Sequence, residues 1–368
     1  MKALALVPGT KTVRMADRPE PQLSKPDEIK LKVLRVGICG TDREEVAGGR
    51  SRAPEGSNDL VIGHEMLGRV VEVGKDVRRV KPGDLAVFTV RRGCGKCTSC
   101  LMNRSDMCST GDFSERGIWG MDGYETECVV DKEQYVVYLS PELGATGVLT
   151  EPTSVVEKAI DESVRLQTAR LPDAPSTPDW LHGRRCFVAG LGPIGLLGAM
   201  VLRLRGAEVY GLDIVDGGSA RPRWLEDIGG KYIDGRKVPV NNVASAVGPM
   251  DLILEAAGIP SLDFNLLDAL ATNGVYVLTG IPGGDRPLQI PGAMLMRQLV
   301  LKNQVIVGSV NAGRDFFQMA ADDLARADLI WKGYVDKLIT HRYACTDFAK
   351  AFGEHPQDEI KSVIEWAQ

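Results

Sequence analysis

The chain has 368 residues, of which 44% are hydrophobic and 25% charged, and its formal net charge at pH 7 is −5. A chain of this length is long enough for two domains, each with its own core. Lysine and arginine are scattered along it, so the composition gives no sign of a nucleic-acid or anionic membrane surface. The longest apolar run, residues 186–202, contains four glycines and a proline and is too interrupted to span a membrane.

The first 140 residues predict a β-rich unit. Stretches rich in Val and Ile alternate with Gly, Pro and Asp punctuation, as in Lys81-Pro-Gly-Asp84. The strands predicted in this part are residues 28–36, 61–73, 85–90 and 124–130.

From about residue 185 the pattern changes to alternating strands and helices, which is typical of a doubly wound α/β sheet. Predicted strands are residues 185–189, 207–212, 251–255, 274–278 and 300–307, and predicted helices are residues 194–205 and 220–228. Residues 171–178, with three prolines, predict an exposed loop before this region. After residue 311 the chain looks helical, most clearly over residues 314–326.

A glycine motif follows the first of these α/β strands and opens the first helix. Its residues are Gly190, Leu191, Gly192, Pro193, Ile194 and Gly195. In this context the glycines permit a tight turn, close approach to a pyrophosphate and close packing of helix on strand. A lone GxGxxG often only packs, but here strand, helix and a following acid all favour dinucleotide binding.

That acid, Asp213, ends the next predicted strand. A carboxylate there accepts hydrogen bonds from the adenosine ribose and repels a 2′-phosphate, which favours NAD over NADP. Arg221 and Arg223 follow closely and could pair with a 2′-phosphate, so use of NADP stays open.

Four cysteines lie within fifteen residues: Cys94, Cys97, Cys100 and Cys108. Four thiolates at this spacing can close around one tetrahedral structural Zn²⁺. Redox-active thiols and a zinc ribbon that binds nucleic acid are the alternatives, and few basic residues surround the cluster. The remaining cysteines are dispersed and the N-terminus lacks the pattern of a signal peptide, so we expect a reducing, cytoplasmic setting.

A second, dispersed set of metal-ligating residues is Cys39, His64, Glu65 and Glu151. One thiolate, one imidazole and carboxylates can form an open Zn²⁺ site with room for water or substrate. Taken singly, His64 would more often be a hydrogen-bonded structural histidine and Cys39 a small buried residue.

In combination, these motifs resemble those of the zinc-dependent medium-chain alcohol dehydrogenases, in order and spacing, over essentially the whole chain. Within that family the chain is most similar to the archaeal-type glucose (aldose) 1-dehydrogenases. The segments that carry this closer similarity are residues 115–118, 150–160, 307–311 and 360–365.

The resemblance implies a GroES-like, β-rich catalytic domain of residues 1–155 and 309–368, and a Rossmann domain of residues 156–308. It implies two zinc ions per chain and an NAD or NADP cofactor. Catalytic zinc would be held by Cys39 and His64, with Glu65 and Glu151 as ligands or partners through water. The sugar would contact Thr41, Glu115, Glu151 and Asn311. The cofactor would lie along residues Leu191 to Ile194, Asp213, Thr279, Gly280, Ile281, Ser309, Val310 and Asn311.

The implied reaction is oxidation of the anomeric carbon of an aldose to a lactone, with Thr41 passing a proton toward solvent. The resemblance also implies a homodimer or homotetramer, with a small sugar or polyol as the partner rather than nucleic acid or membrane. Some relatives of this branch carry an aspartate where Val155 stands, which leaves open whether glucose itself is the substrate. The alternatives are a dehydrogenase of another polyol or secondary alcohol (sorbitol, threitol or an aminocyclitol) and a non-catalytic NAD-binding sensor.

Overall fold

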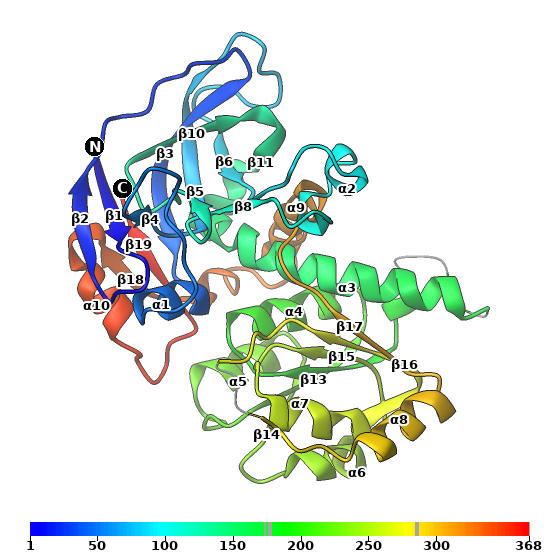
Figure 1. Ribbon diagram of the computed structural model, residues 1–368. Helices are drawn as coiled ribbons and strands as arrows, with labels where there is room; N and C mark the ends of the chain where they lie inside the picture. Colours follow the sequence, from blue (N-terminus) through cyan, green and yellow to red (C-terminus); the bar gives the residue numbers. More distant parts are fainter. Residues whose placement is uncertain (173, 176–178, 284–286, 368) are drawn as a thin grey trace. The chain divides into compact units, whose positions relative to one another are not determined.

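The computed structural model describes residues 1–172, 174–175, 179–283 and 287–367. Its contacts divide the chain into two compact units, Met1–Ser154 with Asn311–Gln368, and Val155–Val310. Figure 1 labels most of the helices and strands of both units.

The first unit is built on a mixed seven-stranded sheet with strand order β11-β6-β5-β3-β19-β18, and β10 pairs with β3. Its strands are β3 (Glu28–Gly37), β5 (Glu65–Val73), β6 (Leu85–Phe88), β10 (Cys128–Lys132), β11 (Val136–Leu139), β18 (Ile339–Ala344) and β19 (Lys361–Glu365). Alternating apolar residues of β3 bury one face of the sheet against Phe88 and Tyr124. Because β19 pairs antiparallel with β3, the C-terminal segment belongs to the same core as the N-terminal one.

Two small sheets and short helices complete the first unit. The sheets are β2 (Val13–Asp17), β1 (Lys2–Leu6) and β4 (Leu60–Val61), and β7 (Arg91–Arg92), β8 (Ser114–Arg116) and β9 (Gly120–Met121). The helices are α1 (Gly40–Val46), α2 (Thr98–Leu101), α9 (Arg314–Ile330) and α10 (Phe348–Gly353). The 3₁₀ turns are η1 (Ser105–Met107), η2 (Glu133–Tyr135), η3 (Pro141–Leu149), η7 (Asp336–Leu338) and η8 (Cys345–Asp347).

The second unit is a six-stranded parallel sheet with helices in the connections, and its strand order is β14-β13-β12-β15-β16-β17. The strands are β12 (Arg185–Ala189), β13 (Glu208–Asp213), β14 (Lys231–Asp234), β15 (Met250–Glu255), β16 (Leu270–Leu278) and β17 (Val305–Gly308). The helices are α4 (Pro193–Leu204), α5 (Ala220–Asp227), α6 (Val243–Val247), α7 (Pro260–Leu266) and α8 (Gly292–Leu301), with 3₁₀ turns η4 (Asp179–Leu181), η5 (Val240–Asn242) and η6 (Leu267–Ala269). This is the 3-2-1-4-5-6 order of the dinucleotide-binding fold. The predicted fold class, a β-rich domain plus a Rossmann domain, is confirmed.

One long helix, α3 (Thr150–Arg170), runs across the boundary between the two units, and no element was predicted there. Val155, Ser309 and Val310 were predicted to lie in the catalytic domain but belong to the second unit. Backbone groups of Ser309 and Val310 form hydrogen bonds within the second unit. Ser309 N–H donates to the carbonyl of Leu278 on β16, and Lys158 of α3 donates to the carbonyl of Val310.

The single strand predicted over residues 61–73 is wrong, because the chain forms β4 and β5 with a break at residues 62–64. Gly63 has φ +88° and its carbonyl accepts the N–H of Tyr124. Because Tyr124 makes this contact, the strand predicted over residues 124–130 does not start at residue 124. The observed strand, β10, begins at Cys128. The break places His64 at the entrance of β5 rather than within a strand.

The strand predicted over residues 300–307 is also wrong in its first half. Val300 and Leu301 end helix α8, and Asn303 at φ +47° lies in the turn that separates that helix from β17. Short apolar runs stand on both sides of the polar residues 302–304, and such a run is equally compatible with a helix end and a strand, so the pattern concealed the helix end. The helix predicted after residue 311 is present as α9. The prediction did not include β18 and β19, because these strands form by pairing with each other and with the distant strand β3. Part of the loop expected at residues 171–178 lies outside the described residues.

Within the described ranges, no helix combines the length and hydropathy that a membrane span requires.

Candidate active site and metal centres

Three of the predicted metal ligands converge in the first unit. Cys39 is the N-cap residue of α1, and His64 and Glu65 lie where the chain enters β5. One ligand atom from each residue lies within 4.8 Å of those from the other two. A thiolate, an imidazole and a carboxylate suit an open zinc site, which uses three protein ligands and leaves a position for water or substrate. The donor set therefore fits a zinc ion with a free coordination position.

Asp42 orients His64 from behind. Its carboxylate oxygen Oδ1 lies 3.3 Å from His64 Nδ1, and its Oδ2 accepts the N–H of Cys39 at 2.7 Å. Burial opposes charge on His64, but Asp42 and the Cys39 thiol outweigh it and raise the pKa of His64 well above its ordinary value. Because Nδ1 faces Asp42, the other ring nitrogen is left as the ligand, an arrangement common among metal-bound histidines.

Glu65 is paired with a residue from the far end of the sequence. Lys361, at the start of β19, is only 2% exposed, forms an ion pair with Glu65 and donates to the carbonyl of Ile38 at 2.9 Å. Gly37 leaves room for this pair, since a Cβ there would lie 2.1 Å from Glu65 Oε2. No role was predicted for Lys361, because only the pairing of β19 with β3 brings it to the site.

Glu151 and Thr41 lie at the edge of this centre. Glu151, in the first turn of α3, is buried but does not belong to the group whose ligand atoms meet. Burial raises the pKa of Glu151 to about 7, Glu65 adds to the rise, and His64 and Lys361 oppose it. This position suits a partner through water better than a direct ligand. The Thr41 hydroxyl lies 3.9 Å from the Cys39 sulfur.

Glu115 and Asn311, both predicted to contact the sugar, are in direct contact with each other. Asn311 Nδ2 donates to Glu115 Oε1 at 2.9 Å, and its own Oδ1 accepts the N–H of Ala312. Arg91, the cross-strand neighbour of Glu115, donates to the same Oε1 through Nε and Nη2 at 3.0 and 2.8 Å. These contacts hold Glu115 in one orientation although it is nearly fully buried.

The four cysteines of the 94–108 segment form a second cluster, with their sulfurs all within 4.8 Å of one another. All are free thiols, and Cys94 and Cys100 sulfurs are 3.9 Å apart. Backbone N–H groups of Cys100 and Ser109 lower the pKa of Cys97 to about 7, whereas burial raises the pKa of Cys100 to about 12. Four converging sulfurs fit a closed tetrahedral zinc, which deprotonates its thiols and leaves no position for substrate.

The glycine motif of the second unit forms the expected turn between β12 and α4. Gly190 has φ +87°, and a Cβ on Gly195 would lie 1.8 Å from the Gly190 carbonyl oxygen. No described atom lies within 4 Å of a Cβ placed on Gly192, the N-cap of α4, so the backbone there faces open space. Leu191 is buried behind the turn, and Pro193 is the first helical residue. Open backbone at a helix N-terminus fits a dinucleotide pyrophosphate.

Asp213, at the end of β13, is engaged with this turn. Its Oδ2 accepts the N–H of Leu191 at 3.0 Å and lies 3.5 Å from Arg221 Nη1, and its Oδ1 accepts the N–H of Ile214 at 2.6 Å. Arg223 instead donates to the carbonyl of Ser219. The acid and one of the two candidate arginines therefore lie together where an adenosine ribose would bind.

A buried acid that was not predicted, Glu255, supports the other cofactor loops. Its Oε1 accepts the N–H groups of Ala257 and Gly258 at 2.6 and 2.5 Å, and its Oε2 accepts that of Gly280 at 3.0 Å. Thr279 donates its hydroxyl to the Glu255 carbonyl. A single carboxylate thus joins the loops after β15 and β16. Ile281 and Val310 are at least half exposed, and Ser309 is buried beside β16.

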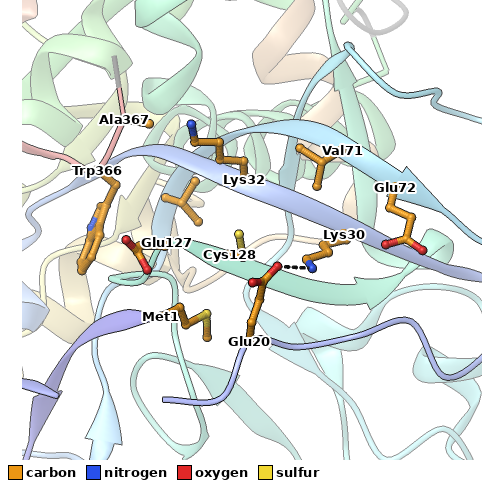
Figure 2. Close-up of a pocket in the computed structure, with 11 residues that line it drawn as sticks. Met1, Glu20, Lys30, Lys32, Val71, Glu72, Glu127, Cys128, Trp366 and Ala367 are labelled. Carbon is orange, nitrogen blue, oxygen red and sulfur yellow. Dashed lines mark hydrogen bonds and ion pairs between the residues drawn. The ribbon is translucent and has the colours of Figure 1, made fainter. Parts of the chain in front are cut away.

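A separate cavity of about 840 Å³ lies on the first unit beside β3 and β10 (Figure 2). It shares no residue with the sites above. Glu20 and Lys30 form an ion pair at its wall, and Cys128 and Trp366 also line it. Its charged groups are mixed in sign, so we assign it no role.

Comparison with protein families matches two models. Residues 25–141 match the alcohol dehydrogenase GroES-like domain, and residues 144–366 match the glucose dehydrogenase C-terminus. Among curated proteins, a glucose 1-dehydrogenase of Vulcanisaeta moutnovskia is 38% identical over 100% of both chains. One of Thermoproteus tenax is 38% identical over 99% of both.

Among solved structures, the chain is similar to the glucose dehydrogenase of Haloferax mediterranei in complex with NADP, Zn and gluconolactone. The TM-score is 0.89, with 32% identity and 100% of each chain covered.

Proposed function

This chain belongs to the zinc-dependent medium-chain alcohol dehydrogenases, and from that premise we propose that it oxidises the anomeric carbon of an aldose to a lactone. In the net reaction C1 gives a hydride to NAD(P)⁺ and the C1 hydroxyl gives up a proton. The observation that carries the proposal is the meeting of Cys39, His64 and Glu65 ligand atoms. The full-length similarity to glucose 1-dehydrogenases, one of them in complex with gluconolactone, supports the aldose as the substrate class.

We assign the catalytic zinc to Cys39, His64 and Glu65, with Glu151 as a partner through water. A zinc ion held there would supply Lewis acidity, which makes a substrate hydroxyl easier to deprotonate near neutral pH. Asp42 fixes the His64 ring, and Lys361 compensates the charge of Glu65. We assign the passage of the proton from the substrate hydroxyl toward solvent to Thr41, whose hydroxyl lies 3.9 Å from the Cys39 sulfur.

Sugar hydroxyls are assigned to Thr41, Glu115, Glu151 and Asn311. A pocket built from such groups penalises substrates that lack a hydroxyl, because its buried polar atoms would then lose their partners. The second candidate function is oxidation of another polyol at the same centre. Val155 supports this alternative, because it stands where some relatives of the branch carry an aspartate.

We assign the cofactor to the turn Gly190–Gly195, Asp213, the loop Thr279–Ile281 and residues Ser309–Asn311. The nicotinamide, when bound, accepts the hydride. The carboxylate of Asp213 favours NAD, and Arg221 beside it is compatible with NADP.

We also propose that the chain forms a homodimer or homotetramer through its second unit. Strand β17 ends the six-stranded sheet, and α8 exposes more than half of Met294, Met296, Val300 and Leu301. An open strand edge beside exposed apolar side chains is a surface that a second copy would cover. Light scattering coupled to gel filtration should give a multiple of 39.8 kDa, and a stable monomer at micromolar concentration would contradict this. Eight free thiols favour a reducing compartment, such as the cytoplasm.

The function is tested by NADH and NADPH formation with the zinc-loaded protein across aldoses, polyols and simple alcohols. Reduction with glucose, galactose or xylose supports the aldose assignment. Activity confined to polyols or simple alcohols would retain the zinc centre and discard the substrate class. Cys39→Ser and His64→Ala should abolish turnover while cofactor binding is kept, and Arg52→Gln, in the same unit, should remain active.

A further inference from the structure

The two oxygens of the Glu115 carboxylate have very different surroundings. Oε1 accepts three hydrogen bonds, two from Arg91 and one from Asn311. A carboxylate oxygen has about two favourable acceptor directions, so Oε1 has no capacity left for a ligand. Any substrate hydroxyl that Glu115 binds must therefore reach Oε2.

Oε2 has one partner among the described residues, Arg50, whose Nη2 donates to it at 3.2 Å. The Arg50 side chain is 57% exposed, whereas that of Arg91 is 10% exposed. Only one of the five N–H donors of Arg50 is used in this contact. Four donors of a side chain that is more than half exposed therefore remain for a ligand.

The backbone keeps Arg50 close to Glu115. Arg52 N–H donates to the Ile118 carbonyl at 3.1 Å, and Gly120 N–H donates to the Arg52 carbonyl at 2.8 Å. The loop that carries Arg50 is thereby fastened to the turn that follows Glu115.

Arg50 also acts electrostatically on Glu45, a buried carboxyl of helix α1. Burial is the main cause that raises the pKa of Glu45 to about 9, and Asp42 and Cys39 add to the rise, whereas His64 and Arg50 oppose it. The charge of Arg50 therefore opposes the rise in the pKa of Glu45, and Cys39 and His64 of the metal centre also shift that pKa.

We propose that Arg50 is a specificity-determining residue that contacts the substrate. Together with Glu115 Oε2 it offers a donor and an acceptor side by side, which bind two neighbouring hydroxyls of the sugar. This inference rests on the proposed function, because it assigns the sugar to the Glu115 side of the site. Arg91 is a positioning residue that holds Glu115 for this contact, and Asn311 supports the same orientation of Glu115 in addition to its own assigned contact with the sugar.

The test compares Arg50→Gln and Arg50→Lys with Arg52→Gln as a matched control, since the Arg52 guanidinium lies over the Trp119 ring and, among the described residues, forms no ion pair or side-chain hydrogen bond with Glu115. Arg50→Gln should raise the KM for the preferred aldose about tenfold, the size expected for losing a charged hydrogen bond, and leave kcat and the KM for NAD nearly unchanged. Arg50→Lys should lie between wild type and Arg50→Gln. A set of monodeoxy sugars gives the decisive readout. Wild type should discriminate strongly against at least two adjacent deoxy positions, and Arg50→Gln should lose that discrimination.

An unchanged KM and unchanged deoxy discrimination in Arg50→Gln would overturn the inference. An equal effect in Arg52→Gln would do so too, because it would show a disturbed loop. If the wild type oxidises no aldose, the proposed function fails by itself. Saturation-transfer NMR with glucose then decides the inference: signals that weaken in Arg50→Gln but not in Arg52→Gln uphold the contact, and absence of signals in wild type overturns it.

Discussion

At the scale of single residues, the candidate centre depends on partners as much as on ligands. Lys361 and Asp42 hold Glu65 and His64, and both are almost completely buried. A buried carboxylate without a cation beside it would strongly destabilise the folded protein. The ion pair with Lys361 offsets this cost of burying the charged Glu65. Residue type alone could not reveal this, because a lysine in a terminal strand is usually solvated.

Asp213 gives a prediction about cofactor choice. Asp213→Ala removes the carboxylate that accepts the Leu191 N–H and faces Arg221. The ratio of kcat/KM for NAD over NADP should fall about tenfold or more, because repulsion of a 2′-phosphate is lost and Arg221 is released. Asp216→Asn is the control, since that side chain is 74% exposed. An equal change in both variants would refute a specific role for Asp213.

Asp131 gives a prediction about pH. It accepts hydrogen bonds from Arg92 and Arg116, and although burial opposes its charge, the two arginines lower its pKa from 3.8 to about 2. A lowered folded-state pKa stabilises the protein above the unfolded value, and this is lost as the pH falls from about 4 toward 2. The shift corresponds to about 2 kcal/mol.

Asp131→Asn should therefore destabilise the protein at pH 7, and the difference from wild type in unfolding free energy should narrow below about pH 4. Urea denaturation at a series of pH values measures it. Asp17→Asn, which breaks an exposed pair with Lys2, should show little effect at any pH. A constant difference across the pH range would mean that the Asp131 pair is not responsible.

At the scale of elements, the site is assembled by turns that pack on each other. Gly117, which follows β8, lies against Gly63, which precedes His64, and a Cβ on Gly117 would be 2.3 Å from the Gly63 carbonyl oxygen. The backbone after β8, which carries Glu115, therefore packs directly on the backbone before β5, where His64 lies.

Gly117→Ala should be strongly destabilising, by roughly 2 kcal/mol or more, because it adds a backbone clash to an unfavourable φ of +76°. Gly120→Ala is a matched control, since its φ is +69° but its nearest contact is at 3.9 Å. It should cost only about 1 kcal/mol for the left-handed conformation. Thermal unfolding compares the two, and equal losses would show that the packing on Gly63 is unimportant.

At the scale of the whole molecule, two units with separate cores carry separate parts of the function. Both metal clusters belong to the first unit and the glycine turn to the second. The two clusters also share no residue, so loss of one metal site should leave the other cluster and the glycine turn intact.

Zinc content tests this independence. Wild type should hold about two zinc ions per chain after dialysis, and His64→Ala and Cys97→Ser about one each. His64→Ala should keep its unfolding temperature and its NADH binding, whereas Cys97→Ser should lose stability first, because its metal closes a loop of the fold. Elemental analysis and NADH fluorescence provide the measurements. One zinc in wild type would remove the catalytic assignment and favour a non-catalytic NAD-binding protein.

The sequence by itself determined the features that depend on local order. The cysteine spacing, the glycine motif with its strand, helix and acid, and most of the buried β-strands were predictable because neighbouring residues decide them. Tertiary structure alone decided the break at Gly63, the end of α8, the pairing of β19 with β3, and the contacts of Lys361, Glu255 and Arg50. Each of these rests on contacts between residues far apart in the chain, and local pattern carries no information about which distant group will be buried against which. Charge compensation and backbone packing therefore complete a candidate site whose proposed ligands were predicted from the sequence.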